Sequence, residues 1–206
     1  MNYLEELSLE LDKLKKGDFV KVNIHLNING DLLNLCQKIN DEISKTGYNF
    51  IKFGKESILI PHISLFMGYI NSYEQFEFIL NTAYDFALST DRFRIDPTRL
   101  HIAERTLNSS KYVLLDLLQN EEIFQKKKFF DDLLHAKIKP MEWDFLNTSS
   151  HITVGCFDKT LKHIEQNLNK YYEFPYCEIK DIGISISGKK GMCFGNLKTY
   201  DLCKVK

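Results

Sequence analysis

The sequence predicts an α+β fold with mainly antiparallel strands. Apolar residues recur with the period of strands in some stretches and of amphipathic helices in others, and several strands follow one another through short turns. A doubly wound parallel sheet would need long crossovers between neighbouring strands instead. The length of 206 residues, with only 10 Gly and 4 Pro, suits one compact unit without a flexible linker. We therefore expect a single domain over residues 1–206.

The first 90 residues contain three expected helices and two expected strand regions. The first helix has leucines at helical spacing between charged residues and ends at Gly17, while Asp31 is the expected cap of the second. In order, the expected elements are an amphipathic helix at about 3–16, a half-buried strand at 19–26, a helix at 31–45, a β-rich run at 57–69 and a helix at 72–88.

The rest of the chain adds short strands around two further helices. Its expected elements are strands at 93–95, 100–103 and 112–117, a helix at 121–135, an irregular stretch at 140–150, a strand at 151–157, a helix at about 160–171, and final strands at 177–187 and 192–202. The sequence Gly188-Lys189-Lys190-Gly191 between the last two strands is typical of a hairpin turn.

The charge balance excludes a protein that binds nucleic acid through bulk positive charge. Lys plus Arg number 27 and Asp plus Glu number 28, which gives a net charge of −1. The four arginines nevertheless cluster between Arg92 and Arg105. This cluster is either a solvated strand face or a rim that binds nucleotide phosphates, and in the second case Arg94 and Arg99 are the candidate substrate-binding residues.

Neither the N-terminus nor the cysteines suggest export or a membrane. The first residues are acidic where a secretory leader has basic ones, and the longest nearly apolar run, at 57–70, is shorter than the roughly 18 residues of a membrane span. Five cysteines without a CxxC motif favour free thiols in a reducing cytoplasm. Cys156, five residues after His151, is a less favoured candidate nucleophile, because a free cysteine is usually a small core residue.

Two nearly identical motifs of four residues carry most of the functional information. They are His62-Ile63-Ser64-Leu65 and His151-Ile152-Thr153-Val154, each with the order His, apolar, hydroxyl, apolar. Because alternate residues of a strand point to the same side, each motif places an imidazole and a hydroxyl on one face. The alternative, that both motifs are core strands with satisfied histidines, gives no reason for the repeated hydroxyl.

The motif pair suits phosphodiester cleavage without a cofactor. The reaction needs a base for the attacking oxygen and an acid for the leaving oxygen, and histidine can take either role near its ordinary pKa of about 6.5. The hydroxyls can donate hydrogen bonds to non-bridging phosphate oxygens. We therefore predict His62, Ser64, His151 and Thr153 as catalytic residues, with no metal. A metal site of the two histidines and a carboxylate is the less favoured alternative, and phosphate loops of the GxGxxG and GxxxxGK[ST] types are absent from the sequence.

These motifs resemble those of the 2H phosphoesterase superfamily, which includes LigT-like 2′-5′ RNA ligases and cyclic phosphodiesterases. The two histidines are 89 residues apart and Pro61 precedes the first. The C-terminal segments Ile182–Ser185 and Gly195–Leu202 are similar to the closing strands of that family. The resemblance covers about residues 19–202.

The resemblance implies a bilobal fold with pseudo-twofold symmetry, in which antiparallel sheets line a central cleft and helices lie outside. It also implies that His62 and His151 are an acid–base pair, that Ser64 and Thr153 hold the phosphate, and that catalysis is independent of metal. The helix at 3–16 has no counterpart in the minimal family pattern. The sequence Thr148-Ser149-Ser150 before the second histidine also differs from the Arg-Pro of bacterial ligase-type members, which weakens assignment to the ligase branch.

The predicted function is that of a monomeric, cytoplasmic phosphodiesterase that cleaves 2′,3′-cyclic phosphates, 2′-5′ linkages or RNA 3′ ends. Two alternatives stay open: degradation of signalling oligonucleotides such as 2′-5′ oligoadenylate or cyclic dinucleotides, and RNA or nucleotide binding without catalysis. Trp143 and Phe145, just before the second motif, are candidates for base stacking, although packing into the core explains them equally well. Structural roles are expected for the histidines outside the motifs, His25, His101, His135 and His163.

Overall fold

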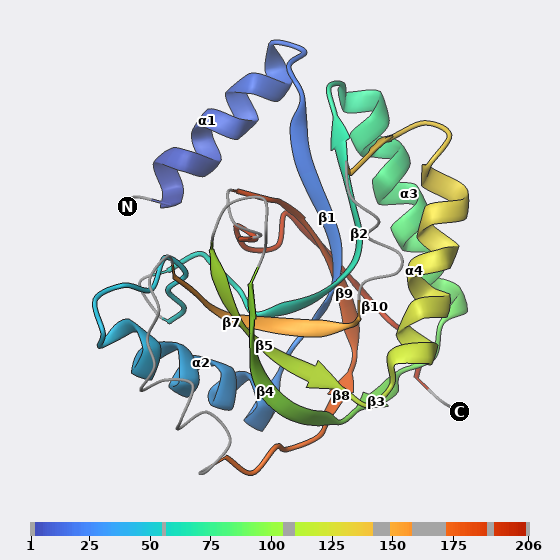
Figure 1. Ribbon diagram of the computed structural model, residues 1–206. Coiled ribbons are helices and arrows are strands. Elements are labelled where there is room, and N and C mark those ends of the chain that lie inside the picture. Colours follow the sequence, from blue (N-terminus) through green and yellow to red (C-terminus); the bar gives the residue numbers. More distant parts are fainter. Residues whose placement is uncertain are drawn as a thin grey trace.

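The computed structural model describes residues 3–54, 57–104, 110–141, 149–157, 172–188 and 192–204. In these ranges the predicted α+β class is confirmed, because helices alternate with strands whose mutual pairings are antiparallel. The helices are α1 (Tyr3–Lys15), α2 (Gly30–Ser44), α3 (Tyr73–Ser89) and α4 (Asn120–Leu134). The strands are β1 (Val20–Asn27), β2 (His62–Ile70), β3 (Phe93–Ile95), β4 (Pro97–Glu104), β5 (Lys111–Leu117), β6 (Lys139–Pro140), β7 (His151–Phe157), β8 (Cys177–Ile179), β9 (Asp181–Ile186) and β10 (Lys198–Asp201) (Figure 1).

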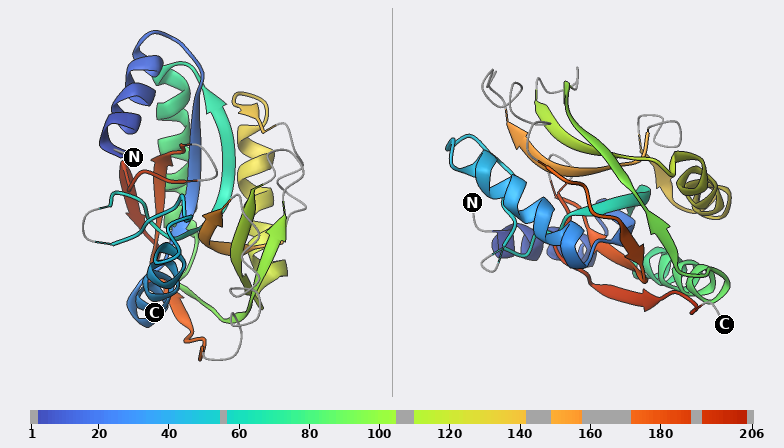
Figure 2. Two further views of the ribbon diagram at one scale, coloured as in Figure 1. Left: turned by 60° about the vertical axis from the view of Figure 1, so that its left-hand side comes forward. Right: turned by 90° about the horizontal axis from the view of Figure 1, so that it is seen from below.

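The two motif strands belong to different sheets that meet. A five-stranded sheet has the order β10-β9-β1-β2-β6, a three-stranded sheet has the order β4-β5-β7, and β3 pairs with β8 in a third sheet. Strand β7 lies against β2 where the two larger sheets meet (Figure 1). Helices α3 and α4 pack beside the five-stranded sheet, and α2 packs on β7 at the opposite side of the molecule (Figures 1 and 2).

The five-stranded sheet has one apolar face and one polar face. The apolar face consists of buried residues that are register partners on β1, β2 and β9, namely Val20, Val22, Ile24, Leu26, Ile63, Phe66, Ile70, Ile182, Ile184 and Ile186. Ile138, which follows α4, covers this face at Gly68, where an added Cβ would lie only 2.8 Å from the Ile138 side chain. The other face carries Asn23 opposite Ser185 and His25 opposite Ser64.

Strand β1 differs from its prediction, because it is buried on both faces instead of one. It lies between β9 and β2 in the middle of the sheet, and the side chains of Asn23 and His25 on its polar face are as inaccessible as those on its apolar face. Alternation in the sequence shows which residues share a face, but it does not show that something else covers the polar one.

Other predictions of elements are confirmed, with changes at their ends. Helix α1 is amphipathic as predicted and packs against β1. Ser72 caps α3 by accepting a hydrogen bond from the Gln75 amide. The prediction that Asp31 caps α2 is wrong, because Asn29 is at the N-cap and Asp31 lies in the first turn. The segment expected to form one strand at 177–187 divides into β8 and β9, and the stretch expected to be irregular begins with β6.

Two predictions fall partly outside the described residues. The helix expected at about 160–171 lies outside them, and so do three residues of the expected turn at 188–191. The described ends of that turn are antiparallel, since Ser187 bridges Cys193 and the Gly188 amide donates to the Met192 carbonyl. No helix in the described part of the chain is long and apolar enough to cross a membrane.

Candidate active site

His62 begins β2 with one ring nitrogen already bonded. Its Nδ1 lies 2.9 Å from the carbonyl oxygen of Ile60, two residues earlier. A carbonyl can only accept a hydrogen bond, so Nδ1 carries a hydrogen and Nε2 is the acceptor of the neutral ring. The backbone before the motif therefore selects the tautomer of His62.

His151 begins β7 in the same way. Its Nδ1 lies 2.8 Å from the carbonyl oxygen of Ser149, again two residues earlier. The same reasoning assigns the hydrogen to Nδ1 and makes Nε2 the acceptor when the ring is neutral. The two histidines thus share a local bonding pattern as well as a sequence motif.

A β-bulge follows the hydroxyl residue in both motif strands. On β2, Ser64 is opposite His25 and Phe66 is opposite Ile24, so Leu65 is the additional residue. On β7, Thr153 is opposite Leu114 and Gly155 is opposite Val113, so Val154 is the additional residue. The bulge occurs at the fourth position of each motif, and bulges are frequent beside active sites because they redirect side chains.

Helix α2 holds the bulge of β7 from behind. The Asn40 side chain donates hydrogen bonds of 2.8 Å to the carbonyl oxygens of Val154 and Ile51. An added Cβ at Gly155 would lie 2.6 Å from Cδ1 of Ile43, so the helix approaches the strand closely here. These contacts fix the part of β7 that carries Thr153.

Asn23 orients the hydroxyl of the first motif. Its Nδ2 donates to Oγ of Ser64 at 2.8 Å and lies 3.4 Å from Nε2 of His62. Since Ser64 accepts this bond, its own hydroxyl hydrogen is available to donate to a bound anion. Asn23 was not predicted from the sequence. The sequence feature that could have indicated it is its position two residues before His25, which places both side chains on the same face of β1.

Cys193 is the second unpredicted partner of His62. Its sulfur lies 3.2 Å from Nε2 of His62, and both side chains are buried. Burial alone would lower the pKa of His62, but the charge and hydrogen bond of the Cys193 sulfur raise it. Burial would likewise raise the pKa of Cys193, and the His62 charge and hydrogen bond lower it. The two groups therefore favour a proton on the imidazole.

His25 lies directly behind His62 and is fully buried. The two ring centroids are 5.0 Å apart, and neither nitrogen of His25 meets a well-formed hydrogen bond among the described residues. Burial, and then the nearby His62, hold the pKa of His25 well below its ordinary value. The side chain is therefore a neutral part of the site's floor, which agrees with the structural role predicted for it.

Arg99 and His101 extend the face of the three-stranded sheet that carries His151. Asp116 is opposite His151 on one side and opposite Arg99 on the other, so the three side chains share a face. The Arg99 Nε donates to Asp116 Oδ2 at 2.8 Å, and His101 Nδ1 lies 3.2 Å from the same oxygen. The structure thus brings the predicted Arg99 to the second motif. It places beside it Asp116, which was not predicted, and His101, for which a structural role was expected.

Of the other predicted binding residues, Arg94 is described and is not brought to the motifs. Arg94 lies on β3 in the separate β3–β8 sheet, where its Nε donates to Asp96 at 2.8 Å and its guanidinium lies 4.2 Å from the ring centroid of Tyr176. Trp143 and Phe145 lie outside the described residues, as does Arg105. Arg94 and Arg99 of the arginine cluster therefore lie in two different sheets.

The remaining histidines and cysteines agree with structural roles where they are described. His135 is exposed at the end of α4, 3.6 Å from Asp131, and His163 lies outside the described residues. All five cysteines are free, and Cys156 is buried in the core, as a packing residue would be. In the described ranges, no three His, Cys, Asp or Glu side chains gather closely enough to hold a metal ion.

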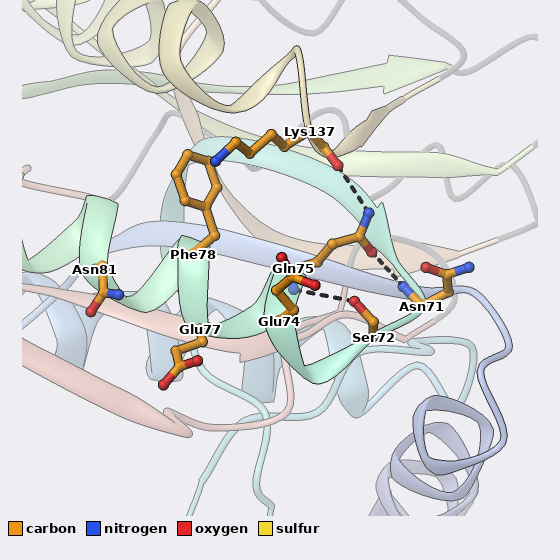
Figure 3. Close-up of a pocket in the computed structure, with 8 residues that line it drawn as sticks. All are labelled: Asn71, Ser72, Glu74, Gln75, Glu77, Phe78, Asn81 and Lys137. Atoms are coloured by element: carbon orange, nitrogen blue, oxygen red, sulfur yellow. Dashed lines mark hydrogen bonds between the residues drawn. The ribbon is translucent and has the colours of Figure 1, made fainter.

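A surface pocket of about 500 Å³ lies away from the motifs, at the start of α3. Figure 3 shows Gln75 at its centre, between the amide of Asn71 and the carbonyl of Lys137. The Lys137 ammonium lies 3.9 Å from the ring centroid of Phe78. Neither motif contributes a residue to this pocket, so the candidate site remains the region where β2 meets β7.

Comparisons with known proteins reveal similarity in structure alone. No protein-family model matches the sequence, and no curated protein matches it. Among solved structures, TT0787 of Thermus thermophilus matches with a TM-score of 0.61 and 13% identity, over 88% of this chain and 97% of that chain. Escherichia coli LigT complexed with 3′-AMP matches with a TM-score of 0.54 and 11% identity, over 89% and 98% of the two chains.

This chain has the fold of these proteins. A third match, Usb1 of Kluyveromyces marxianus, has a TM-score of 0.52 and 10% identity, over 88% of this chain and 97% of that chain. The resemblance to LigT-like proteins that the two motifs predict is thereby confirmed at the level of the fold.

Proposed function

We propose that this chain is a phosphodiesterase of the 2H type, which cleaves 2′,3′-cyclic phosphates, 2′-5′ linkages or RNA 3′ ends. The observation that carries the proposal is the repeated geometry of the two motifs. Each motif has a histidine with Nδ1 bound to the carbonyl two residues earlier, a hydroxyl two residues later, and a bulge at the fourth position. The fold shared with LigT and Usb1 supports the same class of reaction.

In the proposed reaction, the two Nε2 atoms exchange protons with the substrate. The neutral imidazole accepts a proton from the attacking oxygen, and the protonated imidazole donates one to the leaving oxygen. Ser64 and Thr153 donate hydrogen bonds to the non-bridging oxygens, where negative charge increases in the transition state. Asn23 supports this role of Ser64 by occupying an acceptor site of its hydroxyl.

Histidine variants test the proposal directly. Hydrolysis of a 2′,3′-cyclic mononucleotide, a 2′-5′ dinucleotide and a cyclic dinucleotide is measured for the wild type, His62→Ala, His151→Ala and the control His135→Ala. We expect each motif variant to lose about 10²- to 10⁴-fold in kcat on the preferred substrate, because a general acid or base is removed. His135 is exposed at the C-terminal end of α4 and belongs to neither motif, so its variant is expected to keep full activity.

Addition of EDTA is expected to leave the wild-type rate unchanged, since the proposed steps use proton transfer and hydrogen bonding. Full activity in either motif variant would contradict the proposal. Salt-sensitive RNA binding without turnover of any substrate would instead indicate a binding protein. The preferred substrate in the panel separates RNA processing from degradation of signalling oligonucleotides.

A further inference from the structure

The buried thiol of Cys193 belongs to the site, yet the proposed reaction does not use it. Its sulfur contacts Nε2 of His62 at 3.2 Å and Oγ of Ser187 at 3.6 Å. The residue is only 1% exposed. Water therefore does not compete for these contacts in the structure, and the sulfur is the closest described partner of the nitrogen that must act on substrate.

Backbone pairing fixes the sulfur in this position. Ser187 and Cys193 form an antiparallel bridge, and Leu59 and Phe194 form another. The amide of Ile60 donates to the carbonyl of Cys193 at 3.4 Å, while the carbonyl of Ile60 binds Nδ1 of His62. The imidazole is therefore held at both nitrogens by two neighbouring segments that also bind each other.

A proton lies between the sulfur and Nε2 in either charge state of the pair. Because Nδ1 carries a hydrogen, the neutral ring accepts at Nε2 and the Cys193 thiol is the donor. Transfer of that proton gives a thiolate and an imidazolium, whose Nε2 hydrogen then donates to the sulfur. The net charge of the pair is the same in both forms.

Apart from Cys193, the titratable groups near His62 do not favour its protonation. The His25 ring on β1, which is neutral, has its centroid 5.0 Å from that of His62. Lys21, also on β1, is a cation and lowers the pKa of His62. Burial acts in the same direction. Among the described residues that influence His62, Cys193 is the acidic group. Its charge and hydrogen bond, followed by the bond from Nδ1 to the Ile60 carbonyl, raise the pKa of His62 despite burial and Lys21.

We propose that Cys193 is a positioning residue for His62, whose thiol holds Nε2 in place and keeps a proton available there until a substrate oxygen takes the position of the sulfur. Its catalytic consequence rests on the proposed phosphodiesterase function. The contact between sulfur and imidazole does not, so the two can be tested separately.

The direct test follows the titration of His62 by NMR in protein with isotope-labelled histidine. Spectra are compared for the wild type, Cys193→Ser, Cys193→Ala and the control Cys203→Ser, and a His62→Gln spectrum identifies the signal. Without the sulfur, burial dominates, so the titration midpoint of His62 falls by about one pH unit or more in both Cys193 variants. It stays unchanged in the control, whose sulfur binds the Leu88 carbonyl.

The pH dependence of hydrolysis tests the catalytic consequence. The profile of kcat/KM reports the free enzyme, so its limb due to His62 moves to lower pH in Cys193→Ser. The His62 limb of the kcat profile moves less, because kcat reports the enzyme–substrate complex, in which a substrate oxygen has replaced the sulfur at Nε2. Serine nearly preserves size, and a thermal unfolding midpoint close to that of wild type shows that the variant is folded.

The outcomes separate the two proposals. If folded Cys193 variants leave the His62 midpoint unchanged, the positioning role is overturned, whatever the activity of the enzyme. If the midpoint falls but the wild type turns over no phosphodiester, the pair is supported and the proposed function fails. If the His62 midpoint falls, and the His62 limb of kcat/KM moves with it while that of kcat moves less, both the positioning role and the proposed function are supported.

Discussion

The pKa values of the neighbouring residues His25 and His62 are shifted in opposite directions. Their rings are 5.0 Å apart and both are buried. His62 has a carbonyl at one nitrogen and a sulfur at the other, which raise its pKa. At His25, burial and the nearby His62 outweigh a backbone hydrogen bond with Leu26 and lower its pKa. The difference arises from the partners of each ring, since the burial is shared.

At the residue scale, we predict that His25 makes the fold sensitive to acid. Its folded pKa is depressed, so below about pH 6.5 the unfolded chain takes up a proton that the folded chain refuses, and stability falls as pH falls. Between pH 7.5 and 5.5 this costs about 1 kcal/mol. Urea unfolding at both pH values should show a smaller loss for His25→Gln than for the wild type.

The exposed histidine provides the control for that experiment. His135→Gln is the matched control for replacing a histidine by glutamine, because His135 is exposed at the end of α4 and lies outside the buried site. Parallel losses in the wild type and His25→Gln would show that His25 takes up its proton without penalty in the folded state.

The sequence predicted the four motif residues because a repeated local pattern marks them. It could not predict Asn23 or Cys193, which reach His62 from positions 39 and 131 residues away. The Asn23 contact depends on the pairing of β1 with β2. The Cys193 contact depends on the pairing of the segment after β9 with residues 59–60. Such long-range pairing leaves no local signal in a single sequence.

At the level of elements, the start of α3 is determined by a side chain next to it in the sequence. Ser72 has extended backbone angles, and its Oγ accepts a 3.2 Å hydrogen bond from the Gln75 amide, which satisfies one of the unpaired amides of the first turn. This helix start was predicted from the sequence. The burial of β1 was not, because it depends on neighbours that are distant in the chain.

We predict that Ser72→Ala lowers the free energy of unfolding by about 1 kcal/mol, through loss of this cap. Ser89→Ala is the matched control, since the Ser89 hydroxyl donates to carbonyls of the same helix near its end and caps no amide. Urea unfolding of both variants checks the difference. Equal stabilities of the two variants would mean that the cap contributes nothing measurable.

For the whole molecule, the near-zero net charge limits how the substrate is attracted. A protein that makes six to ten phosphate contacts loses about 10³- to 10⁵-fold in affinity between 50 and 200 mM salt. The net charge here is −1, and Arg99, the arginine on the face of the second motif, is already paired with Asp116. Under the proposed function, we therefore expect the substrate to be one phosphodiester instead of a long polyanion.

We therefore predict that kcat/KM on a 2′,3′-cyclic mononucleotide falls by less than about 10-fold between 50 and 200 mM NaCl. The fall is small because binding of one phosphate releases few counterions. Arg99→Gln should reduce this dependence further if the guanidinium meets the phosphate. Initial rates at substrate concentrations well below KM measure it. A loss of more than about 100-fold would instead reveal an extended polyanion-binding surface.

The bulges in β2 and β7 put each motif out of phase with the rest of its strand. Ser64 and Phe66 are two residues apart, but they face opposite sides of the sheet because Leu65 intervenes as an unmatched residue. Thr153 and Gly155 are related in the same way across Val154. If β2 kept Leu65 but paired with β1 without the bulge, every catalytic side chain of the first motif would still be present. With the frame of β2 from Phe66 onward unchanged, however, regular alternation would put His62 and Ser64 on the face of Phe66, in the apolar layer under the helices.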